Sequence, residues 1–173
     1  RFWLQNCNGL PTTKDKNWFQ YDLKNVTDNN IHYYAFPESN INASNSDITS
    51  HLGQIHQNVV QSGVFTITNT KGYPHNHKYQ PGGISSGFHG RLENRYACTR
   101  RDKYGRWHYH EFFGKANQMR VYTLYRVNIN NNTTGGSTAW AQQQRALLAD
   151  NNDTNPRTHV IDALILELND AIN

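Results

Sequence analysis

The sequence predicts a single mixed α/β domain, and three patterns along the chain predict that class. A strand, a helix and a second strand follow one another at the start. The middle is rich in short β-forming runs, and the last part returns to helical spacing. With 173 residues the chain is long enough for one domain with a sizeable core and too short for two ordinary ones.

The N-terminal unit has the pattern of a β-α-β crossover. Residues 2–8 alternate partly in polarity and run into a turn signal at 9–11, which indicates a strand followed by a loop. Apolar residues keep helical spacing over 18–26, and the β-rich run 31–36 stops at Pro37. Such a unit places two parallel strands in one sheet.

The middle region predicts one more helix and then mainly antiparallel strands. Leu52, Ile55 and Val59 mark the apolar face of a helix that ends at Gly63. The expected strands are 64–68, 84–88, 96–99, 107–113 and 119–127. Because glycines separate the later strands at short intervals, we expect antiparallel hairpins there.

The last part predicts two helices after a polar, Asn-rich loop. Ser137 suits the N-cap of the first helix, and Asn155-Pro156 opens the second. The second helix has an apolar stripe made of Val160, Ile161, Leu164, Leu168 and Ile172. The sequence stops within this helix, where an α/β chain normally returns to its sheet. We therefore expect a continuation of the chain or a neighbouring chain to complete the sheet.

Composition excludes several classes of protein. Charged residues are 17% of the chain and aromatic residues 12%, which argues against charge-driven disorder and supports a packed interior. The sequence has no run of about 18 apolar residues, so we expect no membrane partner. Two cysteines are too few for a disulfide scaffold, although one bridge would satisfy them. Nothing in the sequence indicates a compartment.

The net charge is modestly basic and is concentrated in one segment. Lys and Arg outnumber Asp and Glu by 17 to 13, a net charge of +4. Between positions 91 and 106 only Glu93 and Asp102 oppose a set of basic residues, namely Arg91, Arg95, Arg100, Arg101, Lys103 and Arg106. This segment predicts a patch that fits an anionic partner such as nucleic acid, with a plain solvated loop as the alternative.

Two polar residues follow the first two predicted strands of the crossover. Asn8 follows the first strand and Glu38 follows the second. Both should lie at the carboxyl edge of the sheet, where α/β proteins bind ligands. A carboxylate there can hold a hard divalent cation, and an amide can orient a phosphate or a metal-bound water. The alternative for Glu38 is an ordinary surface residue.

Histidines are numerous but do not predict a metal site. His108 and His110 are two positions apart, so on a strand they share a face. Zinc sites need three or four ligands, and no third ligand is positioned by the sequence. We interpret these residues as polar strand histidines.

Short motifs in a fixed order carry a resemblance to a known family. In chain order they are Asn8-Gly9-Leu10, Phe36-Pro37-Glu38-Ser39-Asn40, Pro81-Gly82-Gly83, Gly105-Arg106-Trp107 and Leu124-Tyr125-Arg126-Val127-Asn128. This order resembles the endonuclease/exonuclease/phosphatase superfamily of deoxyribonuclease-I-like enzymes, and within it the endonuclease domains of LINE-type retrotransposons. The resemblance implies a four-layer α/β/β/α sandwich.

The resemblance also implies roles for individual residues. Asn8 matches the first active-site Asn of the family, Glu38 its metal-binding Glu, and Tyr125 the Tyr that contacts the phosphate. The implied cofactor is Mg²⁺ or Mn²⁺, held by Glu38. The nucleic-acid contacts expected from the resemblance and the basic segment are Arg91, Arg106, Arg126 and Asn128.

Two later motifs of the family are missing from this sequence. Neither a Gly-Asp-x-Asn loop nor a closing Ser-Asp-His occurs, and His159 precedes a helix, so it does not fill the role of the closing His. The resemblance therefore implies that residues 1–173 are the N-terminal portion of one metal-dependent phosphodiesterase domain that cuts nucleic acid. This portion alone should be nearly inactive. The alternative is a non-catalytic binding or structural protein that keeps the fold without the activity.

Overall fold

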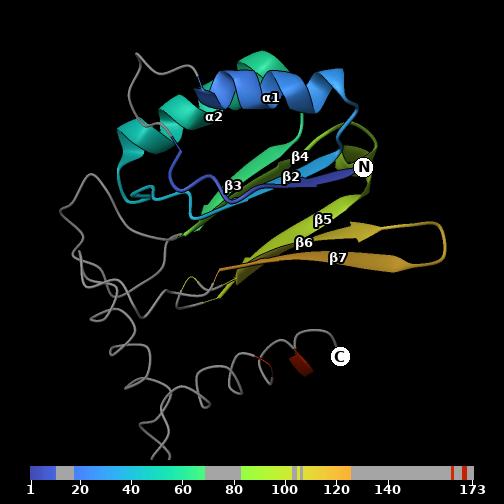
Figure 1. The fold of residues 1–173 in the computed structure, drawn as a ribbon. Helices are drawn as coiled ribbons and strands as arrows, with labels where there is room; N and C mark the ends of the chain where they lie inside the picture. The colour runs from blue at the N-terminus through green and yellow to red at the C-terminus, as the bar shows by residue number, and fades with distance from the viewer. Residues whose placement is uncertain are drawn as a thin grey trace, which may run out of the picture.

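A computed structural model of the chain describes residues 1–10, 18–68, 83–102, 105, 107–125, 165, 169 and 170. Over these residues the chain forms a mixed α/β structure in which two β-sheets face each other (Figure 1). Two helices cover the face of the first sheet that points away from the second (Figure 1). The predicted mixed α/β class is therefore confirmed at this level.

The elements follow one another in the predicted order. They are β1 (Phe2–Leu4), α1 (Trp18–Asp28), β2 (Tyr33–Pro37), α2 (Ser46–Val60), β3 (Val64–Thr68), β4 (Ile84–Phe88), the 3₁₀ helix η1 (Gly90–Arg95), β5 (Tyr96–Arg101), β6 (Trp107–Phe113) and β7 (Gln118–Leu124). The first sheet has the strand order β1-β2-β4-β3, and the second has the order β5-β6-β7.

The predicted crossover is present, with one correction. β1 and β2 are parallel neighbours, and α1 connects them. The predicted strand over residues 2–8 is too long, because β1 ends at Leu4 and lies at the edge of the described sheet. Backbone bonds to the β2 side nevertheless continue beyond Leu4: Gln5 N donates to Ala35 O at 3.0 Å and Cys7 N to Pro37 O at 3.4 Å.

The later strands pair in antiparallel fashion, as predicted. β4 pairs with both β2 and β3, and β6 pairs with both β5 and β7. The last strand ends earlier than the predicted 119–127, because β7 stops at Leu124. Since β2 and β4 run in opposite directions, Ile84 lies beside Pro37 at one end of the sheet and Phe88 lies beside Tyr33 at the other.

Side-chain alternation along β2 builds two separate cores. Tyr34 and Phe36 point toward α1 and α2 and join the apolar cluster beneath these helices. Tyr33 and Ala35 point the opposite way and pack with Phe88 and Phe112 between the sheets. Successive strand residues face opposite sides of a sheet, so a strand buried on both faces reads as a nearly continuous apolar run.

The C-terminal predictions fall largely outside the described residues. The two expected helices, including the stripe from Val160 to Ile172, are not described, apart from helical backbone at residues 165, 169 and 170. Within the described part of the chain, no helix is long and apolar enough to cross a membrane.

Candidate active site

The loop that carries Glu38 is joined by backbone hydrogen bonds to the loop that carries Asn8. Gly9 N donates to Glu38 O at 2.7 Å, and Leu10 N donates to Ser39 O at 2.8 Å. On its other side, Glu38 N donates to Gly83 O at 2.9 Å. The expected proximity of the two loops at the carboxyl ends of adjacent parallel strands is therefore confirmed for their backbones, although β1 lies at the edge of the sheet among the described strands.

The backbone at this edge adopts conformations that L-residues rarely take. Asn8, Glu38 and Asn40 have φ angles of 46°, 59° and 52°. Left-handed backbone in a residue other than glycine is uncommon, tolerated best by Asn and Asp, and costs about 1–3 kcal/mol. At Glu38 the hydrogen bonds on both sides of the peptide backbone hold this conformation. Its carboxylate is thereby displayed from a fixed loop.

Tyr125 reaches Glu38 from the other sheet. It follows β7 directly, and its hydroxyl donates to Glu38 Oε1 at 3.3 Å, although 87 positions separate the two residues in sequence. A carboxylate has two oxygens and about four acceptor sites, so one tyrosine hydroxyl leaves most of its acceptor capacity available. Asn8, Glu38 and Tyr125, which lie far apart in sequence, are thus gathered at one end of the sandwich.

Cys7 supports the same loop from beneath. Its thiol lies 3.8 Å from Pro37 O and 3.7 Å from Glu38 O, within the range of weak thiol hydrogen bonds. Burial raises the pKa of the Cys7 thiol, so the neutral thiol is favoured. Cys7 is a free cysteine, as is Cys98, so no bridge joins the two. No sequence pattern indicated that Cys7 would contact the Glu38 loop.

The other predicted site residues are not part of this cluster. Arg91 lies in η1, which follows Phe88 at the opposite end of the sandwich. Arg106, Arg126 and Asn128 lie outside the described residues. The structure therefore brings the Asn8 loop, Glu38 and Tyr125 together and places Arg91 at the opposite end.

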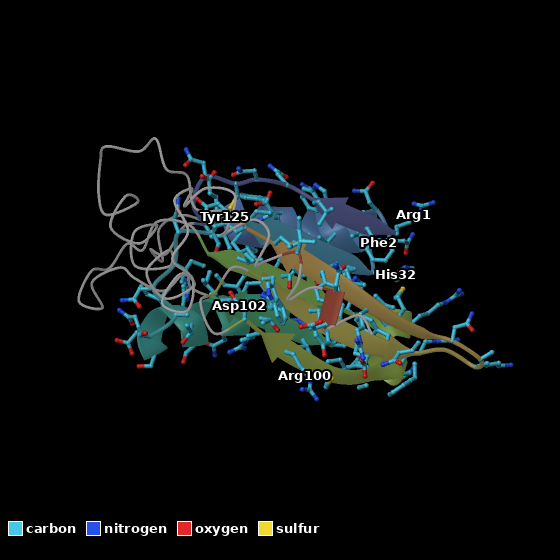
Figure 2. The ribbon with its side chains drawn as sticks, turned by 90° about the horizontal axis from the view of Figure 1, so that it is seen from below. Arg1, Phe2, His32, Arg100, Asp102 and Tyr125 are labelled. Carbon is cyan, nitrogen blue, oxygen red and sulfur yellow. The ribbon has the colours of Figure 1, made fainter. Side chains whose placement is uncertain are left out.

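A second carboxylate lies at the same end of the sandwich as Tyr125. Asp102 directly follows β5 and is buried, with 5% of its surface exposed. In Figure 2, Asp102 and Tyr125 lie toward one end of the molecule and Arg1, Phe2 and His32 toward the other. In the sequence Asp102 stood out only as one of the two acids that oppose the basic segment; in the structure its carbonyl accepts a hydrogen bond from Gly105 N at 3.1 Å.

His108 and His110 share a face of β6, as predicted, and point into the space between the sheets. His108 Nδ1 is 2.8 Å from Thr68 Oγ1, and His110 Nε2 is 2.9 Å from Thr66 Oγ1. The second nitrogen of each ring is also hydrogen-bonded, to Ser86 for His108 and to Tyr33 for His110. Hydroxyl groups therefore occupy all four ring nitrogens.

Burial keeps these two imidazoles neutral. It lowers the pKa of His110 to about 4, with a smaller contribution from the positive charge of Arg101. Burial also lowers the pKa of His108 well below its usual value, and the neighbouring His110 and Arg101 add to the effect. Within the described part of the chain, no carboxylate is hydrogen-bonded to either ring. These residues form a structural network and not a proton-transfer site at neutral pH.

The cluster of Glu38, Tyr125 and the Asn8 loop can offer a carboxylate ligand to a hard cation, but its described residues do not supply a complete set of metal ligands. In the part of the chain that the structure describes, no group of three or more His, Cys, Asp or Glu residues is placed to hold a metal ion. Glu38 is a carboxylate on a fixed loop, with a phenol hydroxyl beside it. This arrangement suits the open type of Mg²⁺ site, in which one or two carboxylates bind and water and substrate phosphate complete the octahedron.

No family model matches the sequence, and no curated protein matches it. A similar solved structure is an endonuclease/exonuclease/phosphatase family protein from Leptotrichia buccalis C-1013-b, with 12% sequence identity and a TM-score of 0.47. The match covers 88% of this chain and 61% of that protein, so this chain spans less than two thirds of its length.

Proposed function

We propose that this chain is the N-terminal portion of a divalent-metal-dependent phosphodiesterase domain that cuts nucleic acid, with Glu38 as a ligand of Mg²⁺ or Mn²⁺. The observation that carries the proposal is the contact between the Tyr125 hydroxyl and Glu38 Oε1 at 3.3 Å, beside the Asn8 loop. The three residues that the motif order singles out follow the separate strands β1, β2 and β7; Tyr125 contacts Glu38, whose loop is hydrogen-bonded to the loop that carries Asn8.

The chemistry of the donor set supports the choice of metal. Mg²⁺ prefers oxygen ligands and usually keeps several waters, so a single well-placed carboxylate is a reasonable protein contribution. A bound divalent cation would supply stabilisation of negative charge on a phosphoryl oxygen. The Tyr125 hydroxyl fixes the orientation of the Glu38 carboxylate, and we propose that it also contacts the substrate phosphate. The Asn8 amide would orient the same phosphate.

The finer parts of the proposal concern fold type and substrate. We propose a four-layer sandwich of the deoxyribonuclease-I-like type, in which a helical layer covers the outer face of the second sheet. We assign the substrate to nucleic acid and the closest branch to the LINE-type retrotransposon endonucleases, on the basis of the Gly-Arg-Trp and Tyr-Arg motifs. Arg91, Arg106, Arg126 and Asn128 are the proposed nucleic-acid contacts.

Metal binding can be tested without any activity. Mn²⁺ is paramagnetic, so in a ¹H–¹⁵N NMR spectrum of the chain it should broaden first the amide signals of residues 7–10 and 38–40. Glu38→Gln keeps the shape of the side chain and removes its charge, so it should abolish this selective broadening. The matched control is Glu93→Gln, an exposed Glu on η1 at the opposite end. If Glu38→Gln and Glu93→Gln retain the same broadening near residue 38, Glu38 is not the ligand.

Cleavage of plasmid DNA tests the reaction itself. We expect slow nicking that requires Mg²⁺ or Mn²⁺, stops in EDTA and falls about 100-fold or more in Glu38→Gln. The rate of this chain should be low, because the sequence lacks the His–Asp pair of the family, and general-base catalysis is worth about 10²–10⁴-fold. Metal-independent nicking that is equal in both proteins would contradict the proposal.

A further inference from the structure

We propose that η1 and β5 form a second, metal-independent binding surface for the phosphodiester backbone of a nucleic acid, separate from the Glu38 site. We call this surface the basic rim and define it by Arg91, Arg95, Arg100 and Arg101. All four side chains are exposed. β5 is an edge strand of the second sheet among the described residues, so the rim lies along an open border of the sandwich.

The positive charge of the rim is only partly offset, by Glu111 on β6, which is ion-paired to Arg120 and also interacts electrostatically with Arg100. Within the described residues, none of the four guanidinium groups forms an ion pair, and the only acid in η1 and β5 is the exposed Glu93. Arg120 on β7 is different, because its Nε donates to Glu111 Oε2 at 2.6 Å. A purely structural arginine is normally paired in this way. The rim arginines instead leave their donors available to an anion.

The positive charge of the rim contributes to lowering the pKa of two neighbouring histidines. The pKa of His32 is lowered mainly by burial, and Arg91 is among the cations that lower it further. At the other end of the rim, Arg101 helps to lower the pKa of His110, again after burial. Positive potential therefore acts at both ends of β5. Such a potential attracts phosphate groups and decreases as salt is added.

The length of the rim fits a polymer and not a small phosphoester. β5 has six residues, and a strand rises about 3.3 Å per residue, so it alone extends roughly 20 Å. One strand of a duplex carries a phosphate about every 3.4 Å along the axis, so a segment as long as β5 spans about six phosphates, and those turned toward the rim can be contacted. At the η1 end, the Arg95 guanidinium lies beside Gly114 in the β6–β7 turn, next to the exposed Lys115, which extends the basic surface.

The rim leads toward the candidate active site. β5 starts at η1, at the end far from Glu38, and finishes at Arg101, next to Asp102 at the Tyr125 end. β5 and β7 are separated only by β6, which corresponds to about 10 Å at normal strand spacing. If the proposed function holds, a nucleic acid bound along the rim therefore passes close to Glu38. The rim itself would bind without that reaction.

Fluorescence anisotropy in EDTA tests the rim independently of metal and catalysis. The probe is a fluorescein-labelled DNA duplex of about 20 base pairs, long enough to cover the rim, titrated with the full chain at several KCl concentrations. Arg100→Gln/Arg101→Gln should weaken binding about tenfold at low salt. It should also reduce the slope of log Kd against log salt by about 1.8, since each lost phosphate contact removes about 0.9.

The matched control is Lys24→Glu on α1, an exposed residue in the helical layer. Both variants lower the net charge by two, from +4 to +2, so net charge alone would affect them equally. We expect Lys24→Glu to bind the duplex like the unmodified chain. Arg91→Gln/Arg95→Gln tests the other end of the rim and should weaken binding as well.

Two results would contradict the proposal that the basic rim binds nucleic acid. One is an equal loss of affinity in Arg100→Gln/Arg101→Gln and Lys24→Glu, which would reduce the effect to net charge. The other is tighter binding of anionic phosphatidylserine vesicles than of the duplex through the same arginines, which would make the rim a membrane surface. The Mn²⁺ experiment on Glu38→Gln tests only the metal site, and the binding experiment in EDTA tests only the basic rim. A negative result in one therefore does not decide the other.

Discussion

At the scale of single residues, a glycine on one strand leaves room for a tyrosine ring that forms a polar contact beneath the helices. Tyr34 is buried between the first sheet and α2, and its hydroxyl is 2.5 Å from Nδ1 of His56. The Tyr34 ring lies over Gly87 on the neighbouring strand β4, with which it is paired. Any side chain at position 87 would occupy the space of the ring. Gly87 is therefore needed for close approach and not for an unusual backbone angle.

Gly87→Ala should destabilise the chain by about 2–3 kcal/mol, because the added methyl group overlaps the Tyr34 ring and displaces its hydroxyl from His56. The measurement is the free energy of unfolding in urea. The matched control is Gly53→Ala in α2, where an added Cβ meets nothing within 4 Å. That change should instead stabilise the chain by about 0.5–1 kcal/mol through helix propensity. Equal effects of the two substitutions would contradict this account.

At the scale of elements, β6 holds the two sheets together through polar as well as apolar contacts. Its inward residues are His108, His110 and Phe112, and all three are buried. Phe112 packs edge-on against Phe88, while the two histidines join the hydroxyls of the facing sheet. A neutral imidazole has one donor and one acceptor, which matches partners that can both donate and accept. This strand therefore depends on neutral histidines.

The free energy of unfolding should decrease as the pH falls from about 6.5 toward 4. The unfolded chain binds a proton at each histidine near pH 6.5, whereas the folded pKa of His110 is lowered to about 4. Protons therefore favour the unfolded state in this window, and stability is greatest above it. Each such histidine contributes a slope of up to about 1.4 kcal/mol per pH unit. Denaturant unfolding between pH 4 and pH 8 measures the slope. His110→Gln keeps a hydrogen-bonding amide but does not titrate, so an unchanged slope in this variant would exclude His110 as a source.

At the scale of the whole molecule, the described sandwich has an apolar border at β1. Trp3 packs against the core beneath the helices, while Phe2 and Leu4 point the other way and are 54% and 66% exposed. β1 has a partner strand on one side only among the described residues. Exposed apolar side chains on an unpaired edge promote association with other strands.

Leu4→Glu should reduce self-association of the chain, because a charge on an edge strand opposes strand pairing. Light scattering coupled to size-exclusion chromatography over a range of concentrations measures the average mass. Tyr21→Glu is the matched control, since Tyr21 lies on α1 and is also 66% exposed. We expect only the change at β1 to lower the average mass. A chain that stays monomeric at every concentration before mutation would contradict the prediction.

Local patterns in the sequence determined most of the elements. The crossover, α2 and the three-stranded second sheet follow from apolar periodicity and from the glycines and prolines between strands, which act over a few residues. Strand ends were less predictable: β1 stops at Leu4 although its backbone bonds continue to Leu10. The point at which regular pairing between β1 and β2 ends depends on the loop around Glu38. This loop is distant in sequence, so the local pattern around β1 does not predict it.

The sequence by itself also determined that Asn8 and Glu38 follow parallel strands, and that arginines gather between positions 91 and 101. Only the tertiary structure decided that Tyr125 meets Glu38, that the arginines line an open edge, and that His108 and His110 are buried among hydroxyls. These facts depend on how one sheet packs on the other. Such packing is set by contacts between residues tens of positions apart, and no local periodicity encodes it.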